Sequence, residues 1–520
     1  QQFTADRDRE RKQLQAMGLL NTVLYLVLPV FALFYLFLRR KYSYWADRNV
    51  PHEPGQFPMG SLKGMGTKYH LIHITDRIYH KFKGTGSMAG FYVTLGPTVL
   101  VTDLELVKQI LVKDFNSFRD RGMYYNEKED PLSAHLFSIE GEKWRYMRNK
   151  LSPTFTSGKI KYMFLTMQEI GDEFVHSFDK YVEAHEPVDM KALAQRFTCD
   201  VIGSCAFGLN CNSLKNEGSE LLAMGDKVFK LNQWQMLKAF FVMSYRDLSL
   251  KLGLRQLPVD VTDYFMNVIQ GTVDHREKNN VVRPDFLQLL MQLKNKGTIE
   301  DHAEDLADKI TMDQAAAQAF LFFFAGFETS STALSFAIFE LAHNPDIQEK
   351  TRAEVQRVLA VHGGHLTYEA IKDMTYLEQV VNESLRMYPP VGNIIRIANQ
   401  PYQLSSPNVV IEKGTMVMIP AYSIQRDPDI YPNPSQFDPD RFTPEAIQAR
   451  HTHTFLPFGD GPRNCIGMRF ALLEVKFGIA QLLSRLSFTL NSRVKLPLEL
   501  ETKSSMMEIK GGLWLDVKKI

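Results

Sequence analysis

The sequence predicts a mainly α-helical protein with a minor β portion, and three observations support this class. Residues 311–343 read as one long helix. From residue 103 to about residue 385 the spacing of hydrophobic residues is largely helical. Residues 90–102, GFYVTLGPTVLVT, alternate around a Gly-Pro turn and predict a hairpin. Residues 389–458 are irregular, β-prone and rich in proline, and a last helix is expected from about Cys465. Without repeats, the 520 residues indicate one large domain.

Charge and cysteine usage exclude several classes of function. The 60 basic and 59 acidic residues give a net charge of +1, which removes any whole-molecule electrostatic argument for nucleic-acid binding. Three of the 4 cysteines, Cys199, Cys205 and Cys211, lie close together without a CxxC pair, which argues against zinc and against a disulfide scaffold. We predict that these three are small buried hydrophobic residues.

The start of the chain predicts a membrane anchor. Residues 17–38 carry no charge over 22 residues, and as a helix they would span roughly 33 Å, enough for a bilayer core. Arg39, Arg40 and Lys41 follow directly and favour the cytoplasmic side for what comes after. The alternative, a cleaved secretory signal, fits less well because the run is long and lacks a small-residue cleavage site.

The rest of the chain divides around this anchor. We interpret residues 1–16 as a non-native or upstream extension, with translation starting at Met17. Residues 39–66 are basic and rich in proline and glycine, which predicts a hinge-like linker, and residues 67–520 form the catalytic domain. The apolar stretch WQMLKAFFVM, residues 234–243, is either a second membrane contact or a buried core helix.

Cys465 stands in an unusual setting, FLPFGDGPRNCIGMRF. Gly461 and Gly467 flank it, and glycine lets the backbone come close to a flat ligand. Helical spacing begins at Ile466, so the thiol lies at a helix entrance, where free N–H groups and the helix dipole stabilise a thiolate. A thiolate is the haem ligand that favours O–O cleavage.

This stretch resembles the haem-thiolate signature of the cytochrome P450 family. The matching residues are Phe458, Gly461, Arg463, Cys465 and Gly467. The resemblance implies a cytochrome P450 fold behind a single N-terminal transmembrane helix, with haem b bound and Cys465 as the iron ligand. The alternative is a loop cysteine with incidental glycines.

Further residues match the family's haem-binding positions. Trp144 and Arg148 are spaced i, i+4 and resemble the Trp-x-x-x-Arg that serves one haem propionate. Arg396 and Arg463 match other propionate-binding positions, where planar guanidinium groups are preferred. Arg121 is a further candidate, for which an exposed loop arginine is an equal alternative.

Glu383 and Arg386 lie i, i+3 and resemble the family's Glu-x-x-Arg. Alone, such a pair is common and contributes little. In the family it joins an arginine of a Pro-x-Arg-Phe stretch, matched here by Arg441, and the resemblance therefore implies a structural brace behind the cysteine.

The long helix contains AGFETSS, which resembles the family's oxygen-binding helix. Gly326 weakens a helix by about 1 kcal/mol, so a compensating function is expected. By resemblance, Ala325 and Gly326 leave room above the iron, while Glu328 and Thr329 convey protons to dioxygen. The alternative is Ser/Thr back-bonding at a helix kink.

The substrate positions suggested by the resemblance are mostly apolar, which predicts lipophilic substrates and broad specificity. Phe320, Phe323 and Phe324 are predicted to be core residues instead. The substrate candidates are Tyr124, Leu132, Leu136, Phe137, Phe322, Ala325, Val391, Asn393 and Ile394.

The chain carries no flavin or nicotinamide fingerprint, so its electrons are expected from a partner. The resemblance implies NADPH-cytochrome P450 reductase, with cytochrome b5 as a possible second donor, at the endoplasmic reticulum membrane facing the cytoplasm. Basic residues that could meet an acidic partner are Lys143, Arg145, Lys150, Arg469 and Lys476.

Stretches such as FTCDVIGSCAFGLNC are similar to insect microsomal P450s that metabolise xenobiotics, and Gln425 departs from the family's usual His. The resemblance implies insertion of one atom of O2 into lipophilic compounds such as plant toxins or insecticides. Alternatives are a biosynthetic P450 acting on a hormone or lipid, a P450-fold isomerase or dehydratase, and a non-catalytic haem sensor or carrier. A metal site at His451 and His453 is a weaker alternative.

Overall fold

A computed structural model describes residues 17, 25 and 27–520, apart from residues 217, 230–232, 300–307, 406–407 and 505. The predicted extension, residues 1–16, lies outside the described residues. The predicted anchor lies partly outside them, because residues 18–24 and 26 are not described.

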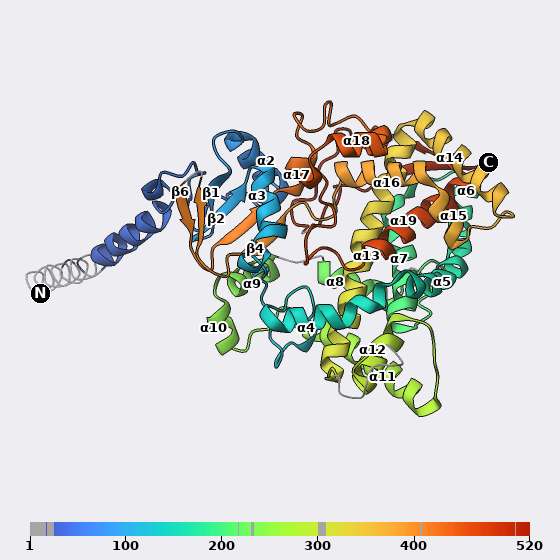
Figure 1. Cartoon of the computed structure of the whole chain (residues 1–520), viewed down its shortest axis with the longest axis horizontal. Coiled ribbons are helices and arrows are strands. Elements are labelled where there is room, and N and C mark those ends of the chain that lie inside the picture. Colours follow the sequence, from blue (N-terminus) through green and yellow to red (C-terminus); the bar gives the residue numbers. More distant parts are fainter. Residues whose placement is uncertain are drawn as a thin grey trace, which may run out of the picture.

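Four helices form the centre of the molecule: α5 (Ser157–His176), α7 (Met190–Phe207), α13 (Met312–His343) and α19 (Met468–Leu483). Helix α13 runs through the middle and packs against both α7 and α19 (Figure 1). It begins with a capping box at Thr311 and is buried on nearly all sides, as expected of a helix that is apolar all round. The predicted long helix is confirmed.

Further α-helices lie around this centre (Figure 1). They are α2 (Leu71–Phe82), α3 (Leu104–Lys108), α4 (Gly141–Leu151), α6 (Asp179–Ala184), α8 (Glu220–Phe229), α9 (Gln233–Ser244), α10 (Arg246–Lys251), α11 (Val259–Asn279), α12 (Phe286–Lys296), α14 (Pro345–Val361), α15 (Tyr368–Asp373), α16 (Thr375–Met387), α17 (Ala421–Gln425) and α18 (Pro444–Ala449).

The β portion is small and divided. A four-stranded sheet has the order β1-β2-β7-β4, with β2 and β7 parallel and the other pairs antiparallel. Its strands β1 and β2 confirm the predicted hairpin. A three-stranded sheet, β3-β9-β8, and the hairpin β5-β6 complete the set. The strands are β1 (Met88–Val93), β2 (Gly96–Val101), β3 (Val188–Asp189), β4 (Ile394–Ile397), β5 (Tyr402–Ser405), β6 (Asn408–Ile411), β7 (Met416–Ile419), β8 (Leu486–Leu490) and β9 (Trp514–Lys519).

The three clustered cysteines are free, and Cys199 and Cys205 are fully buried on α7. Burial raises the pKa of all three thiols, that of the partly exposed Cys211 to about 12. For Cys199 and Cys205, the prediction of small buried hydrophobic residues is confirmed.

The segment predicted to be a hinge is docked on the four-stranded sheet. Trp45 is 0% exposed and donates its indole N–H to the carbonyl oxygen of Phe91 at 3.1 Å. The indole lies directly over Gly90, where an added Cβ would come within 2.4 Å of the ring. His52 extends the contact by a bridge to Gly90. The segment therefore joins the domain as a packed layer and not as a free hinge.

The helix that precedes this segment projects from the body at the N-terminal end (Figure 1). Its described part includes residues 27–42, and apolar side chains such as Phe31 and Leu33 are about two-thirds exposed. Within the described residues, α13 is the helix long and apolar enough to cross a membrane, but it is mostly buried and is a core helix.

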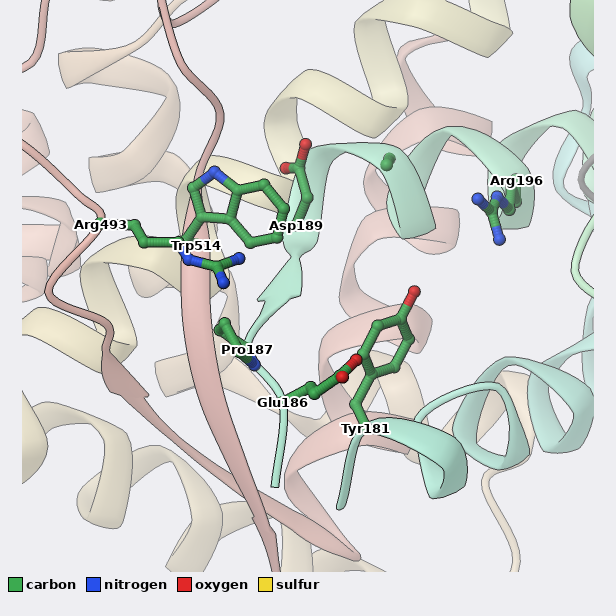
Figure 2. Close-up of a pocket in the computed structure, with 8 residues that line it drawn as sticks. Tyr181, Glu186, Pro187, Asp189, Arg196, Arg493 and Trp514 are labelled. Atoms are coloured by element: carbon green, nitrogen blue, oxygen red, sulfur yellow. The ribbon is translucent and has the colours of Figure 1, made fainter. Parts of the chain in front are cut away.

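A hollow of about 470 Å3 lies between the start of α7 and strand β9 (Figure 2). Arg493 lies over the indole of Trp514 there, with the guanidinium carbon 4.8 Å from the ring centroid, and Asp189 caps α7. The hollow contains none of the predicted site residues.

We expect Trp45→Ala to lower the free energy of unfolding by about 3–5 kcal/mol, because it removes a fully buried indole from a closely packed contact. Urea denaturation in detergent measures the loss. Trp234→Ala is the matched control, since Trp234 is 81% exposed, and should change the stability by less than about 0.5 kcal/mol. Equal losses in the two variants would contradict the docking of Trp45.

Candidate active site

The loop before α19 is held in a shape that requires glycine. Gly461 has a φ of +71°, and an added Cβ would lie 1.8 Å from the carbonyl oxygen of Leu111. The loop closes on itself, because the Cys465 N–H donates to the carbonyl oxygen of Phe458 at 2.9 Å. This geometry fixes the thiol at the entrance of α19, as predicted.

The Cys465 side chain is accessible although the loop lies deep in the fold, and Ala325 of the core helix α13 is likewise exposed. The desolvated surroundings raise the pKa of the thiol, while the Gly467 N–H and the Arg148 and Arg121 guanidinium groups lower it. A thiolate here therefore needs more positive charge than the chain supplies. Iron bound to the sulfur would supply it.

Four guanidinium groups lie near Cys465 and form a cluster, those of Arg121, Arg148, Arg396 and Arg463. Arg148 donates to the carbonyl and side-chain oxygens of Asn464 at 3.1 and 2.9 Å, and Arg121 donates to the Arg463 carbonyl oxygen at 3.0 Å. Burial lowers the pKa of Arg121, and the neighbouring charges of Arg396 and Arg463 lower it further. Arg121 is thus part of the cluster and not an exposed loop arginine.

The arginine cluster contains buried hydrogen-bond donors and positive charges that have no partner in the protein. Arg396 and Arg463 are 1% and 2% exposed, yet Nε of both and one terminal nitrogen of Arg463 have no hydrogen-bond partner. The Asp120 carboxylate lies 4.0 Å from a terminal nitrogen of Arg463. Unpaired buried cations are costly, and two anionic carboxylates would satisfy both the charge and the donors. Haem offers two propionates, so these residues fit the group.

Trp144 supports this cluster by stacking. The guanidinium carbon of Arg463 lies 4.6 Å from the indole centroid, and Phe115 packs against the same indole at 5.6 Å. Trp144 thereby fixes the position of Arg463. The direct contact of Trp144 with a propionate, implied by the resemblance, stays a prediction.

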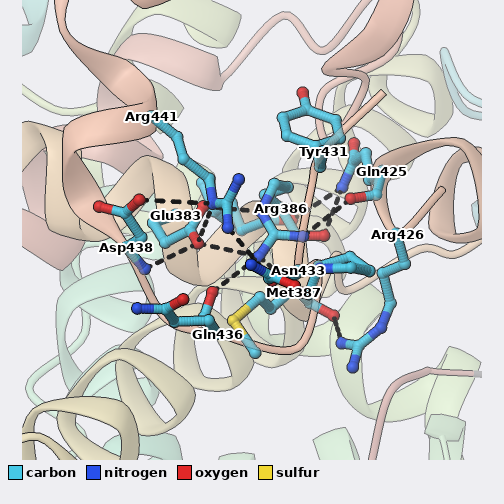
Figure 3. Close-up of polar contacts among 12 residues, drawn as sticks. Glu383, Arg386, Met387, Gln425, Arg426, Tyr431, Asn433, Gln436, Asp438 and Arg441 are labelled. Atoms are coloured by element: carbon cyan, nitrogen blue, oxygen red, sulfur yellow. Dashed lines mark hydrogen bonds and ion pairs between the residues drawn. The ribbon is translucent and has the colours of Figure 1, made fainter. Parts of the chain in front are cut away.

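The predicted brace is formed (Figure 3). Arg386 and Glu383 are both fully buried and make two hydrogen bonds, of 2.7 and 2.8 Å. Arg441 comes within 3.4 Å of the same carboxylate, and the Asp438 N–H donates to it at 2.9 Å. Burial raises the pKa of Glu383, and the Arg386 charge opposes that shift.

Gln425 connects the brace to the cysteine loop. Its side-chain N–H groups donate to the main-chain carbonyl oxygens of Leu385 and Arg386, and its side-chain oxygen accepts from the Leu456 N–H at 2.7 Å. The Arg386 guanidinium in turn donates to the main-chain carbonyl oxygen of Gln425 at 2.9 Å. Sequence reasoning noted the Gln only as a local departure, because its partners lie about 30 to 40 residues away.

The acid and hydroxyl of α13 have different partners. Thr329 donates its hydroxyl proton to the Ala325 carbonyl oxygen, the back-bonding that the alternative interpretation expected. The Glu328 carboxylate is 2.8 Å from Lys191 and accepts from the Gln195 amide at 2.8 Å. Both partners belong to α7 and were missed from the sequence, where they stand more than 130 residues away.

Gly326 permits close packing of two helices. An added Cβ at this position would lie 2.5 Å from the side chain of Ile202 on α7. This contact alone accounts for a glycine in the middle of α13, and the predicted room above an iron stays a prediction.

The predicted substrate residues are placed in three settings. Leu132 and Leu136 are buried in the loop before α4, and the Leu136 N–H donates to Gln318 of α13 at 2.9 Å. Phe137 is 41% exposed and lies under Arg121. Phe322 packs into an aromatic cluster, 4.4 Å from Phe286.

Of the others, Tyr124 is buried and donates to the Leu254 carbonyl oxygen, Val391 is exposed, Asn393 is buried with an unpaired side-chain oxygen, and Ile394 opens β4. A substrate role for each of these residues stays a prediction. The predicted core residues Phe320 and Phe323 are buried, and Phe324 stacks on Phe229 at 4.5 Å.

His451 and His453, considered above as a weaker alternative for a metal site, each lie next to a carboxylate. His451 is 3.0 Å from Glu105, and His453 is 3.2 Å from Asp460. Across the described residues, no group of three or more His, Cys, Asp or Glu side chains could hold a metal ion.

Comparisons with known proteins agree with this geometry. Residues 51–515 match the family described as cytochrome P450. Probable cytochrome P450 6a14 of Drosophila melanogaster is 43% identical over 92% of this chain and 96% of its own length. Cytochrome P450 6A1 of Musca domestica is 43% identical over 93% and 95%, and cytochrome P450 6a2 of Drosophila melanogaster is 41% identical over 96% and 99%.

A thiol at a helix entrance, backed by a buried Glu-Arg brace and flanked by guanidinium groups suited to two propionates, defines a haem-thiolate protein. The chain belongs to the cytochrome P450 family. It is a monooxygenase with haem b as its cofactor.

Arg386→Leu should abolish haem incorporation, because it leaves the Glu383 carboxylate buried without its main partner, at a cost of about 3–5 kcal/mol. Haem content and the strongly red-shifted band of the reduced, carbon-monoxide-bound protein measure the effect. The control is Arg357→Gln, which breaks an i, i+3 pair whose arginine is 67% exposed and should retain full haem content. Normal haem loading of Arg386→Leu would show that the brace is dispensable.

Proposed function

We propose that the enzyme inserts one oxygen atom into lipophilic small molecules of external origin, such as plant toxins and insecticides. The observation that carries the proposal is the haem-thiolate loop together with the Glu328-Thr329 pair on α13, at positions that match the family. The mostly apolar side chains at the predicted substrate positions support lipophilic substrates held by burial, with few polar groups to select among them.

The haem, when bound, supplies the oxygen-activating redox chemistry, and the chain supplies position and protons. Cys465 would hold the haem iron through its sulfur. Thr329 carries a hydroxyl on the accessible stripe of α13 with Ala325, where it can orient water. Glu328, paired with Lys191, can accept and release protons when that pair opens.

Three other functions are weighed against this one. A biosynthetic P450 acting on a hormone or lipid would have the same site and differ only in substrate. An isomerase or dehydratase of this fold would not need the acid and hydroxyl of α13, which are both present here. A haem sensor or carrier would consume no NADPH.

We propose NADPH-cytochrome P450 reductase as the electron donor at a basic surface on the thiolate side, with cytochrome b5 as a second donor. Lys143 and Arg145 on α4 are 65% and 49% exposed, and Arg469 of α19 is exposed. Lys150 donates to the Gly297 carbonyl oxygen, and Lys476 is 4% exposed and 3.0 Å from Glu378. Lys476 is therefore withdrawn from the predicted surface, because it is buried.

We propose that residues 17–38 anchor the protein in the endoplasmic reticulum membrane, that residues 39–66 connect the anchor to the domain and that residues 67–520 face the cytoplasm. An apolar patch on α9 and the following turn supports a second membrane contact. It consists of Trp234, Leu237, Phe241 and Tyr245, which are 81%, 57%, 39% and 49% exposed. Met236 of α9 touches Gly66, so the patch lies beside the docked segment.

Purified protein with reductase and NADPH should oxidise lipophilic compounds that shift the haem spin state. Thr329→Ala should keep consuming NADPH while product falls on the order of tenfold and hydrogen peroxide rises, because proton delivery is impaired. Product, NADPH and peroxide are measured together. Absence of NADPH consumption in wild type would favour the isomerase or the sensor, and unchanged coupling in Thr329→Ala would refute the role of the hydroxyl.

Deletion of residues 17–38 should leave part of the protein bound to phospholipid vesicles, held by the α9 patch. Trp234→Asp with Leu237→Asp in the truncated protein should release it, because two charges replace apolar side chains at the membrane surface. Flotation with vesicles measures binding. Val361→Asp, which changes a 77% exposed residue on α14, is the control. Full solubility of the truncated wild type without detergent would contradict the second contact.

A further inference from the structure

Glu474 of α19 is a buried acid that none of the functions above uses. Its side chain is 0% exposed, and neither carboxylate oxygen has a hydrogen-bond partner. Within the described part of the chain it forms no ion pair, unlike the buried Glu383. An ionised carboxylate in such a place costs several kcal/mol, so the group is a neutral carboxylic acid at neutral pH. Burial raises its pKa to about 8.

The surroundings of Glu474 bring it to the oxygen-binding helix. Helix α13 packs against α19, and the Ser330 hydroxyl of α13 lowers the pKa of the acid. The Ser330 hydroxyl is also buried without a formed hydrogen bond. On α7, Cys205 is close enough to Glu474 for the acid to contribute to the raised pKa of its thiol. Helix α5 presents Phe164 to Phe477 of α19, at 5.3 Å between ring centroids.

Ser330 directly follows Thr329, and successive residues of a helix point about 100° apart. Glu328 therefore points to Lys191 on α7, Thr329 lies on the accessible stripe with Ala325, and Ser330 points to α19. Thr329 thus stands between two acids in different surroundings, one paired with Lys191 and one buried without a hydrogen-bond partner. Different surroundings can give two acids different parts in a proton transfer.

We propose that Glu474 is a second proton source for the reaction, a positioning residue that holds a proton on the α19 side of α13 and delivers it through Ser330. The inference rests on the proposed role of Thr329. In the step, the O–H bond of Glu474 breaks as one forms on the Ser330 oxygen, and the original Ser330 proton passes to a water molecule beside Thr329. No electrons move, and the Glu474 carboxylate regains a proton from solvent water by the reverse route.

The pH dependence has a defined sign. Below a pH of about 8 the folded protein carries the Glu474 proton, and above it the proton is lost, so the yield of product per NADPH should fall as pH rises through about 8. An unfolded chain loses the same proton at the ordinary pKa of 4.5. Since the folded state binds more protons between these values, Glu474 makes stability decrease with rising pH over that range.

The test uses the full-length holoenzyme with reductase and compares Glu474→Gln, Ser330→Ala, Glu328→Gln and the double variant Glu474→Gln/Glu328→Gln from pH 6 to 9. Glutamine keeps the shape of the acid but holds no transferable proton. The matched control is Glu340→Gln, since Glu340 is a buried acid of α13 whose carboxylate already accepts from Tyr388 at 2.6 Å. The measurements are product per NADPH, and the infrared carbonyl band of a neutral carboxylic acid.

Glu474→Gln and Ser330→Ala should each lose about three- to tenfold in product per NADPH at pH 7, less than a sole general acid would, because the Glu328 side remains. Glu474→Gln should also flatten the decline near pH 8 and remove the infrared band, and the double variant should lose more than either single variant. Wild-type coupling with an unchanged pH profile in Glu474→Gln, or an unchanged infrared band, overturns the inference. Failure of Thr329→Ala to uncouple would refute the proposed function separately, since the infrared band does not depend on it.

Discussion

The structure depends on the balance of charge in a dry interior. A thiol that must act as a thiolate, four guanidinium groups and several buried carboxylates lie within one helical core, and water screens few of them. Each charge is stable only with a fixed partner. Glu383 forms an ion pair with Arg386, and Glu328 forms one with Lys191. The unpaired nitrogens of Arg396 and Arg463 would be satisfied by the haem propionates. The fold and the cofactor are therefore energetically linked.

This linkage explains why residues far from the reacting atoms belong to the site. Gln425 joins α16 to the cysteine loop by three hydrogen bonds, and Trp144 sets the position of Arg463 by stacking. Neither residue carries a charge. Both reduce the freedom of a charged neighbour, so that the cluster is arranged before the haem binds.

Much of this was predictable because the signals are local. The signals for four features come from residues that are neighbours in the sequence, and the structure contains all four. They are the hairpin, the long helix, the Glu383-Arg386 pair and the glycines of the cysteine loop. The partners of Glu328, the docking of Trp45 on Gly90 and the burial of Lys476 were not predictable, because each depends on an element distant in sequence. The exposed loop alternative for Arg121 failed for the same reason. Gly326 shows a further limit, since helix packing and catalysis select the same residue.

The seating of Trp45 has a consequence for how the enzyme meets other proteins. Because Trp45 packs the stretch after residue 42 on the sheet, this stretch does not act as a free pivot between the N-terminal helix and the domain. In the proposed membrane-anchored state, the protein itself would set its tilt relative to the lipid surface. Diffusing neighbours in the same bilayer would then always encounter one side of it, and the search for a productive orientation becomes a rotation about a single axis.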